Sequence, residues 1–417
     1  MSKFKILGPT ELSGEVRVSG SKNEALKLIP FSVLLKNKVV FNNVPKITDV
    51  IKQLEIYSLI GGKYAFEKGS LTLDPSGIKS FDIVSDKARQ LRASLVYLGP
   101  LLAKFGKVRI PYPGGCKIGQ RPIGTHTDAF KQLGAETKQV GDGLEITLNQ
   151  VKKTKVSLAE RSVTATENVI MYAAGIDDEI EIKNCATEPE ISALLDVIES
   201  SGAKVMGRDT RNLKIKGSRE LNLKEADVIA DRIEAATFAI AFVATGGEGK
   251  ITPFPKSQLE SFTDVLESCG VKIEYQDGSA MVRKSTELKP FTIKTAPYPG
   301  FPTDLQSPMS LVAARASGTS EIEETMYENR LAYIDELKKI GLEAEVLSEH
   351  RVKIHGPAKF RPTRIRSLDL RSGITILIAG LMTKGETTIE SAEIIDRGYE
   401  NIEDKFAQLK ANIKRIQ

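Results

Sequence analysis

Two kinds of helical segment recur along this chain about every 70 residues: one is apolar on all sides, and the other is apolar along one face only. A helix without a polar face is expected to be buried on all sides, and six segments are of this kind: LKLIPFSVLL, LRASLVYLGPLLAKF, VIMYAAGI, FAIAFVA, MSLVAARA and GITILIAGLM. Other segments carry a single apolar stripe, such as Ile191, Leu194, Leu195 and Ile198 at i, i+3, i+4, i+7 spacing. The pattern predicts central helices, each followed by an outer amphipathic helix.

Two sequence markers share this period. The first is the end of an amphipathic helix before a strand, at Gly62, Gly134, Gly202, Gly270, Gly341 and Lys410. The second is a strand start, at Lys38, Lys107, Glu179, Lys250, Ser320 and Thr387. A glycine-rich turn in AETKQVGDGLEITL supports a hairpin at the end of the unit. We therefore interpret the repeat as strand, helix, strand, helix, strand, strand.

The two ends of the chain suggest how the repeats close. The sixth unit ends after one hairpin strand, NIKRIQ, and the N-terminal strand KFKILGP resembles RVKIHGP of the fifth unit. We expect the N-terminal strand to complete unit six. This predicts a two-domain inside-out α/β prism, or barrel, of six βαβαββ repeats, three per domain. The predicted domains are 22–229 and a discontinuous domain of 1–21 plus 230–417.

Composition narrows the class of protein. Hydrophobic residues make up 41% and charged residues 27%, as in ordinary globular proteins, and a net charge of +5 is too weak to indicate nucleic-acid binding. No signal peptide is evident, and the longest apolar stretch, 373–382, is half a membrane span. Three widely spaced cysteines favour a reducing compartment, so we expect a cytoplasmic protein. We expect neither membrane association nor an obligate protein partner. The histidines, His126, His350 and His355, lack zinc-site spacing, so no metal is expected.

Polar and charged residues begin the six central helices at the same period. They are Lys22-Asn23, Arg92, Ser162-Val163, Arg232, Thr303-Asp304 and Asp369-Arg371. Free backbone N–H groups and the helix dipole at such N-termini favour anions. We expect two domains to form a cleft for phosphates and carboxylates. The alternative is ordinary N-capping with solvated arginines.

A loop rich in Gly and Pro, residues 111–126, carries a cysteine. Cys116 lies beside Lys117 and Arg121, which would lower a thiol pKa and make the sulfur reactive. The alternative is an inert core cysteine, but a Pro-Gly-Gly flank is a poor place for one. Cys185 and Cys269 lie among apolar residues and are expected to be structural. In DRGYENIEDK, Arg397 is the residue we expect to be functional.

With these residues assembled, the chain resembles the enolpyruvyl transferase family, in particular the branch that acts on UDP-N-acetylglucosamine at the first committed step of peptidoglycan synthesis. The resemblance covers essentially the whole chain. It rests on SGSKN, LRASLVYLGPLLAKFG, PGGCKIGQRP, FPTDLQ, ENR, SLDLRSG and DRGYE. It implies a two-domain fold of six units and transfer of the enolpyruvyl group of phosphoenolpyruvate to the 3'-hydroxyl of the sugar, without metal or organic cofactor.

The resemblance also implies residue roles. Lys22, Arg121 and Arg397 would hold the phosphate of phosphoenolpyruvate, with Arg330 and Arg371 near its carboxylate. Cys116 would be the general acid and Asp304 the general base. The residues facing the sugar nucleotide would be Asn23, Arg92, Arg121, Pro122, Ile123, Gly124, Thr125, Ser162, Val163, Asp304 and Met326.

The chain departs from the family pattern near the expected nucleotide base. Gly124 and Thr125 stand where the family usually has Asp-Leu, and that Asp is the usual acceptor for the uracil N–H. Thr164 replaces a common Gly, and Glu160 stands where some members have Lys. Two alternatives remain: the sister enzyme acting on 3-phosphoshikimate, which lacks the Pro-Gly-Gly-Cys loop, and an inactive paralogue that binds sugar nucleotides. The joint presence of Lys22, Cys116, Asp304 and Arg397 argues against the paralogue.

Overall fold

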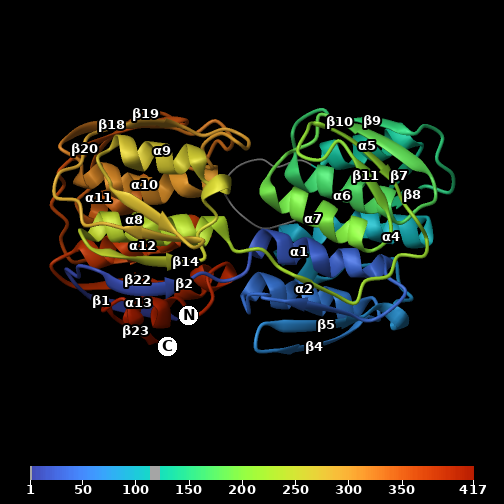
Figure 1. Ribbon diagram of the computed structural model, residues 1–417, viewed down its shortest axis with the longest axis horizontal. Coiled ribbons are helices and arrows are strands. Elements are labelled where there is room, and N and C mark those ends of the chain that lie inside the picture. The colour runs from blue at the N-terminus through green and yellow to red at the C-terminus, as the bar shows by residue number, and fades with distance from the viewer. Residues whose placement is uncertain (1, 113–122) are drawn as a thin grey trace. The chain divides into compact units, whose positions relative to one another are not determined.

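The chain folds into two compact units. The structure is a computed structural model and describes residues 2–112 and 123–417. Of these, unit 1 comprises 2–19 and 230–417, and unit 2 comprises 20–112 and 123–229. Both units have a mixed α/β fold in which helices and four- or three-stranded sheets alternate (Figure 1).

Unit 2 holds these helices: α1 (Lys22–Phe31), η1 (Ser32–Leu34), α2 (Thr48–Leu59), η2 (Pro75–Gly77), α3 (Asp86–Gln90), η3 (Arg92–Tyr97), α4 (Leu98–Phe105), α5 (Gly124–Leu133), α6 (Val163–Ala174) and α7 (Pro189–Ser200). Its strands are β3 (Val39–Asn42), β4 (Lys63–Glu67), β5 (Ser70–Asp74), β6 (Lys107–Pro111), β7 (Glu136–Val140), β8 (Gly143–Thr147), β9 (Lys155–Ser157), β10 (Glu179–Lys183), β11 (Lys204–Met206), β12 (Asn212–Lys216) and β13 (Glu225–Asp227).

Unit 1 holds these helices: α8 (Arg232–Thr245), η4 (Lys256–Gln258), α9 (Glu260–Ser268), α10 (Thr303–Arg315), α11 (Tyr333–Ile340), α12 (Leu370–Met382), η5 (Ala392–Arg397) and α13 (Ile402–Gln408). Its strands are β1 (Lys3–Gly8), β2 (Ser13–Arg17), β14 (Glu248–Thr252), β15 (Ile273–Gln276), β16 (Ser279–Val282), β17 (Thr292–Lys294), β18 (Gly318–Glu323), β19 (Glu343–Ser348), β20 (Arg351–Gly356), β21 (Arg364–Arg366), β22 (Gly385–Glu390) and β23 (Asn412–Ile416).

The apolar helices lie inside the units, as their sequences predict. In unit 1, α8, α10 and α12 pack against one another, and nearly every residue of α8 and α12 is buried. Figure 1 shows these three helices between β18–β20 on one side and β1 and β22 on the other. In unit 2, α4 packs on α6, and α1 and α6 are buried along almost their whole length. Each unit therefore has a core of helices covered by sheets.

The predicted second central helix, LRASLVYLGPLLAKF, is not continuous. Residues 92–97 form the 3₁₀ segment η3, and α4 begins only at Leu98. Pro100 has no N–H to bond the preceding turn, which disfavours an α-helix running through this point. Gly99 also lies so close to α6 that a Cβ would come within 2.1 Å of the Asn168 carbonyl oxygen. The sequence pattern showed the apolar face but not this close approach.

Among the described residues, five sheets share one strand order. The first strand of a repeat lies parallel to the second, which pairs antiparallel with the fourth, and the fourth pairs with the third. The sheets are β9-β10-β12-β11, β13-β3-β5-β4, β2-β14-β16-β15, β17-β18-β20-β19 and β21-β22-β1-β23. The sheet β6-β8-β7 follows the same order, with a parallel bridge from Asp82 to Arg109 in place of the first strand.

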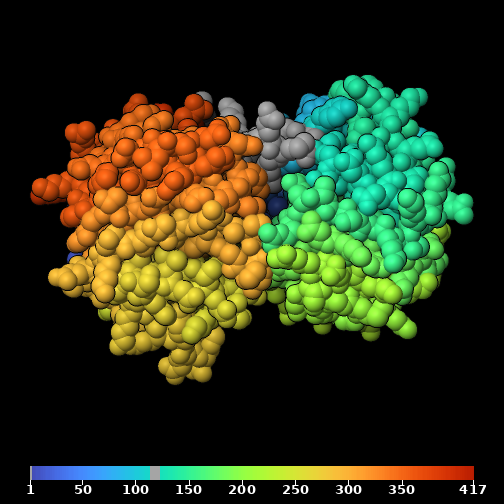
Figure 2. Space-filling view, turned by 90° about the horizontal axis from the view of Figure 1, so that it is seen from above, coloured from blue at the N-terminus to red at the C-terminus, as the bar shows by residue number. Residues whose placement is uncertain are grey.

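The N-terminal strand completes the sixth sheet, which confirms the expectation for the chain ends. β1 pairs antiparallel with β22 through Lys3–Glu390 to Gly8–Gly385 and with β23 on its other side. Figure 1 shows the blue strands β1 and β2 among the red C-terminal elements. In Figure 2 the surface of unit 1 passes from yellow through orange in contiguous patches, so successive repeats cover neighbouring parts of that unit.

Two leading strands are exchanged between repeats. β2, which precedes α1 in the sequence, lies parallel to β14 in unit 1, whereas β13, which precedes α8, lies parallel to β3 in unit 2. Each of these two strands therefore belongs to the sheet of one unit and leads into the central helix of the other. A strand pattern records which side chains are apolar but not which sheet edge the strand will reach.

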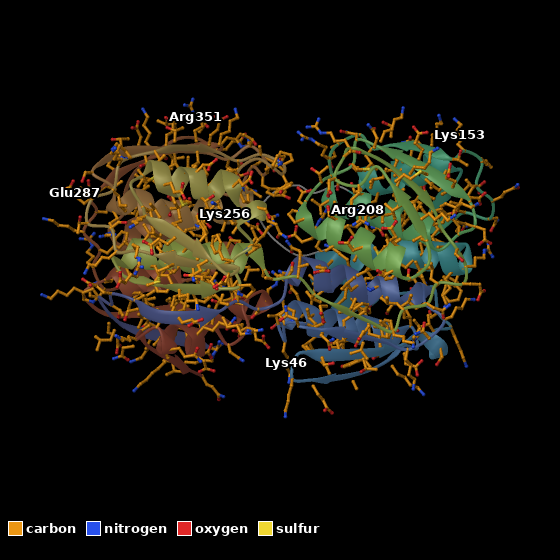
Figure 3. The ribbon with its side chains drawn as sticks, in the orientation of Figure 1. Lys46, Lys153, Arg208, Lys256, Glu287 and Arg351 are labelled. Atoms are coloured by element: carbon orange, nitrogen blue, oxygen red, sulfur yellow. The ribbon has the colours of Figure 1, made fainter. Side chains whose placement is uncertain are left out.

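Charged side chains cover the outside of both units. Lys153, Glu287 and Arg351 are exposed and project away from the ribbon in Figure 3. Many of the exposed charges pair across neighbouring strands, as Arg351 does with Glu321. Such surface pairs contribute little to stability. The ion pairs of the expected site residues lie instead at helix N-termini and are largely shielded from solvent.

Candidate active site

Asp304 holds two arginines at the start of α10 in unit 1. Its Oδ1 accepts from Arg330 Nη2 at 2.6 Å, and its Oδ2 accepts from Arg371 Nη2 at 2.8 Å. The Asp304 side chain is 27% exposed, whereas both arginine side chains are 7% exposed. Three residues expected from the sequence thus meet in one cluster, although they come from α10, from the segment before α11 and from α12.

The charge of this cluster is decided by the two arginines. Burial opposes ionisation of Asp304, but the charges of Arg371 and Arg330 outweigh burial and hold the pKa of Asp304 well below its usual range. Asp304 is therefore ionised, but it is a very weak base while both guanidinium groups face it. The cluster carries one excess positive charge, which suits an incoming anion.

Arg330 and the neighbouring segment are fixed by buried side chains that the sequence did not single out. Gln306 Nε2 donates to the Arg330 carbonyl at 3.1 Å, and Tyr333 donates to Gln306 Oε1 at 3.0 Å. Glu324 is fully buried and accepts from Thr303 at 2.6 Å and from the backbone N–H of Met326 at 2.7 Å. Glu324 thereby ties the segment of Met326 to the first turn of α10.

Arg397 ends η5 and is partly buried. The preceding residue, Asp396, receives two hydrogen bonds from Arg415 of β23, at 2.9 and 2.7 Å, and Arg415 also donates to Glu403 at 2.6 and 3.0 Å. The C-terminal strand therefore fixes the turn that presents Arg397. No sequence signal marked Arg415, because it lies in a short strand with ordinary polar neighbours.

Lys22 begins α1 in unit 2 and is paired with a carboxylate. Its Nζ lies 2.9 Å from Asp49 Oδ2, with the two side chains 12% and 4% exposed. Asp49 lies in the first turn of α2. The ion pair with Asp49 holds the Lys22 ammonium group in a fixed position. Asn23 and Arg92 lie at the starts of α1 and η3, and both are partly buried.

Further into unit 2, α1 and α6 each carry a buried acid. Glu24 is 1% exposed and accepts from the Ile229 N–H at 2.7 Å. Burial raises its pKa to about 8, against the lowering effect of that hydrogen bond. Glu167 of α6 lies 3.0 Å from Lys27 Nζ, and burial raises the pKa of Glu167 to about 7 despite Lys27. These groups make the unit sensitive to pH near neutrality.

Replacing Glu24 with Gln should flatten the pH dependence of stability. The folded pKa of about 8 lies above the ordinary value for glutamate, so the stabilisation is complete below that ordinary value and is lost as pH rises through 8. From about pH 6 to pH 9 the parent should lose ~2–3 kcal/mol of unfolding free energy that Glu24→Gln retains. Denaturant unfolding at several pH values measures this, with exposed Glu136→Gln as control. Parallel curves for the parent and Glu24→Gln would contradict it.

The departures from the family pattern lie together in unit 2. Thr125 Oγ1 donates to Glu160 Oε1 at 2.8 Å, and the Glu160 carbonyl accepts from the Ser162 N–H at 2.8 Å. His126 Nε2 lies 3.1 Å from Thr164 Oγ1. Ser162 caps α6, which Val163 begins. The start of α5 and the start of α6 are thus joined by the residues that differ from the family.

The tautomer of His126 follows from its neighbours. Asn168 Oδ1 accepts from the Gly99 N–H at 2.7 Å, which fixes the amide so that Nδ2 faces His126 Nδ1 at 3.0 Å. His126 Nδ1 is therefore an acceptor. With the ring neutral, the proton lies on Nε2 and is donated to Thr164. His126 is a buried link between α5 and α6, and sequence analysis had not assigned it a role.

Gly124 offers room for the acid that the family usually has at this point. It begins α5, its φ is not in the left-handed region, and among the described residues a Cβ would meet only Asp128 Oδ2, at 4.0 Å. We expect Gly124→Asp to tighten binding of UDP-N-acetylglucosamine about tenfold or more, since a hydrogen bond to a charged group supplies ~1.5–3 kcal/mol. Repulsion from Asp128 would remove a few tenths of a kcal/mol. Titration calorimetry measures the change, and Gly124→Asn is the uncharged control. Equal or weaker binding by the Asp variant would mean that the present loop already supplies the contact.

The expectation of free N–H groups at all six central helices needs correction. Side chains cap four of them, namely Ser21, Ser162, Asp231 and Asp369. The carboxylates of Asp231 and Asp369 already meet the positive ends of α8 and α12, so these ends are poor anion sites. Only α10 and η3 begin without a side-chain cap. Ordinary capping, which was the alternative, is correct for four positions.

Three expected residues, Cys116, Arg121 and Pro122, lie outside the described residues. Within the described ranges, Cys185 and Cys269 are free thiols, and burial raises their pKa to about 12 and about 11.

No group of three or more His, Cys, Asp or Glu suited to a metal occurs in the described part of the chain. None of the helices described there has the length and apolar content to span a membrane.

Comparisons with known proteins identify the family of the chain. The sequence profile of EPSP synthase (3-phosphoshikimate 1-carboxyvinyltransferase) matches residues 6–406. The chain is 38% identical to UDP-N-acetylglucosamine 1-carboxyvinyltransferase 2 of Carboxydothermus hydrogenoformans, over 100% of both chains. It is also 38% identical to the protein of the same name from Bacillus subtilis, over 100% of this chain and 97% of that one.

Two solved structures have the same fold. The enolpyruvyl transferase NikO from Streptomyces tendae aligns with a TM-score of 0.90 at 22% identity, covering 99% of this chain and 98% of NikO. EPSP synthase from Acinetobacter baumannii aligns with a TM-score of 0.74 at 18% identity, covering 100% of both chains. At these identities the likeness concerns the fold. Together with the full-length relatives, the matches show that the chain belongs to the carboxyvinyltransferase family of enzymes, on the branch of the UDP-N-acetylglucosamine 1-carboxyvinyltransferases.

Proposed function

We propose that the protein transfers the enolpyruvyl group of phosphoenolpyruvate to the 3'-hydroxyl of UDP-N-acetylglucosamine, with release of phosphate, in the synthesis of peptidoglycan. The observation that carries this is the cluster of partly exposed Asp304 with buried Arg330 and Arg371, in a chain that matches, over its full length, relatives named for this reaction. We also propose a cytoplasmic location, a pair of three-repeat prisms as the architecture, and domains of 22–229 and 1–21 plus 230–417.

The reaction requires proton transfers at both ends of the new bond. The sugar O–H adds to C2 of phosphoenolpyruvate while C3 gains a proton, which gives a tetrahedral intermediate. The C2–O bond to phosphate then breaks and C3 loses a proton, which regenerates the double bond. In the proposal Asp304 takes the hydroxyl proton, and Cys116 gives the proton to C3. Proton transfer of this kind typically contributes ~10²–10⁴-fold to the rate.

The ion pairs of Asp304 suggest when it becomes a base. Arg330 and Arg371 are proposed to take the carboxylate of phosphoenolpyruvate, and Lys22, Arg121 and Arg397 its phosphate. A bound carboxylate would draw both guanidinium groups away from Asp304, and its pKa would rise because the two charges that lower it are then shared. Substrate binding would thus convert a counter-ion into a general base. The sugar nucleotide is proposed to meet Asn23, Arg92, Arg121 to Thr125, Ser162, Val163 and Met326.

Phosphate release tests the proposal. The purified protein should release phosphate from phosphoenolpyruvate when UDP-N-acetylglucosamine is present, and not with either substrate alone. Release with 3-phosphoshikimate instead would favour the sister activity, and binding of the sugar nucleotide without release would indicate an inactive paralogue. The carboxylate-arginine cluster should bind phosphoenolpyruvate in either active case, so the acceptor decides between them.

A further inference from the structure

A tyrosine lies directly behind Arg371. Tyr399 is 1% exposed, and its hydroxyl oxygen accepts from Arg371 Nη1 at 3.0 Å. The guanidinium carbon lies 5.5 Å from the centre of the Tyr399 ring. The other terminal nitrogen, Nη2, is the one that meets Asp304. Arg371 is thus held from one side by Tyr399 and offers its other side to the acid.

The neighbours of Tyr399 determine which hydroxyl group donates and which accepts in the hydrogen bonds behind Arg371. Thr237 donates its only hydroxyl proton to the Ile233 carbonyl at 2.7 Å, so at 3.0 Å from Tyr399 it can only accept. The Tyr399 proton therefore goes to Thr237, and its lone pairs are left for Arg371. The chain of bonds runs from the guanidinium to the backbone of α8 and connects α12 to a second central helix. Such a connected series is more rigid than its separate bonds.

We propose that Tyr399 and Thr237 are positioning residues that hold Arg371 in the orientation required to bind the carboxylate of phosphoenolpyruvate. This inference rests on the proposed function. An arginine on a helix can rotate its guanidinium by changing its side-chain torsions, and a rotated Arg371 would face neither the substrate nor Asp304 correctly. Binding energy depends on groups that are already in place when the ligand arrives.

The test separates orientation from folding. Tyr399→Phe removes one hydroxyl and keeps the ring. It should lower kcat/KM for phosphoenolpyruvate about 10- to 100-fold, the range that a hydrogen bond to a charged group supplies. KM for UDP-N-acetylglucosamine should stay unchanged. Thr237→Val should give a smaller loss in the same direction, and Thr237→Ser, which keeps the hydroxyl, should restore the parental value.

A double variant and a control complete the design. Because Thr237 acts through Tyr399, Tyr399→Phe with Thr237→Val should lose no more than Tyr399→Phe alone. Tyr275→Phe makes the same chemical change in the same unit at a hydroxyl that bonds Glu267, and should keep parental kinetics. Parental kcat/KM in Tyr399→Phe, additive losses in the double variant, or equal losses for both substrates with a lower unfolding midpoint would each overturn the inference.

The proposed function and the positioning role of Tyr399 can fail independently of each other. If the parent releases no phosphate with the sugar nucleotide, the proposed function is wrong. The positioning role is then decided by calorimetric binding of phosphoenolpyruvate alone. Weaker binding by Tyr399→Phe than by the parent and by Tyr275→Phe would support it, and equal binding by all three would overturn it.

Discussion

Replacing Asp304 with Asn is expected to lower turnover by about 10²–10⁴-fold, the usual contribution of a general base. Asn keeps the shape of the side chain but cannot take the proton of the sugar hydroxyl. It also removes the negative charge that now neutralises part of Arg330 and Arg371. Binding of phosphoenolpyruvate should therefore be kept or tightened while turnover is lost. Steady-state kinetics together with calorimetry measure the two effects.

This pairing of effects is what distinguishes a base from a counter-ion. If Asp304 only neutralised the arginines, Asp304→Asn would change substrate affinity with little change in kcat. Asp335→Asn makes the same charge change at an exposed position in the first turn of α11 and should behave as the parent. Because the variant leaves two buried cations with less compensation, its unfolding midpoint should be measured as well. Near-parental turnover would remove Asp304 from the role of base.

Replacing Cys116 with Ser should be as severe, because a serine hydroxyl is too weak an acid to protonate C3 of phosphoenolpyruvate. A carboxyl group can do so, so Cys116→Asp should retain activity with a pH optimum moved downward, since an aspartate pKa of about 3.9 lies far below a thiol pKa of about 8.5. pH–rate profiles of the three proteins measure this. Turnover by Cys116→Ser at the parental rate would make Cys116 a bystander and would require another proton donor, such as Lys22.

Thiol labelling provides a second measurement for the same residue. Burial raises the pKa of Cys185 to about 12 and of Cys269 to about 11, and both are essentially inaccessible. A thiol-directed epoxide should therefore react at Cys116, and Cys116→Asp should be insensitive. Cys185→Ala and Cys269→Ala are the matched controls and should remain as sensitive as the parent. Labelling that persists in Cys116→Asp would contradict the assignment of a reactive thiol to the loop.

The charged residues of the candidate site could be predicted from the sequence, because they stand in motifs that resemble those of a known family. Asp304, Arg330 and Arg371 were expected at an anion site from family motifs, and the structure places them within hydrogen-bonding distance. The supporting residues Tyr399, Gln306 and Glu324 were not identified, because a buried tyrosine, amide or acid has no pattern that distinguishes a supporting role from ordinary packing. The low pKa of Asp304 was likewise beyond the sequence, since it depends on two arginines 26 and 67 residues away.

The sequence by itself determined the repeat, the central helices and the pairing of the N-terminal strand with the last unit. These follow from hydrophobic periodicity, which is local and records the buried face of each element. Only the tertiary structure decided the exchange of β2 and β13, the break at Gly99 and Pro100, and the capping of four helix N-termini. Each of these depends on which distant backbone comes close, and the free energy of such contacts is set by distance and burial rather than by spacing along the chain.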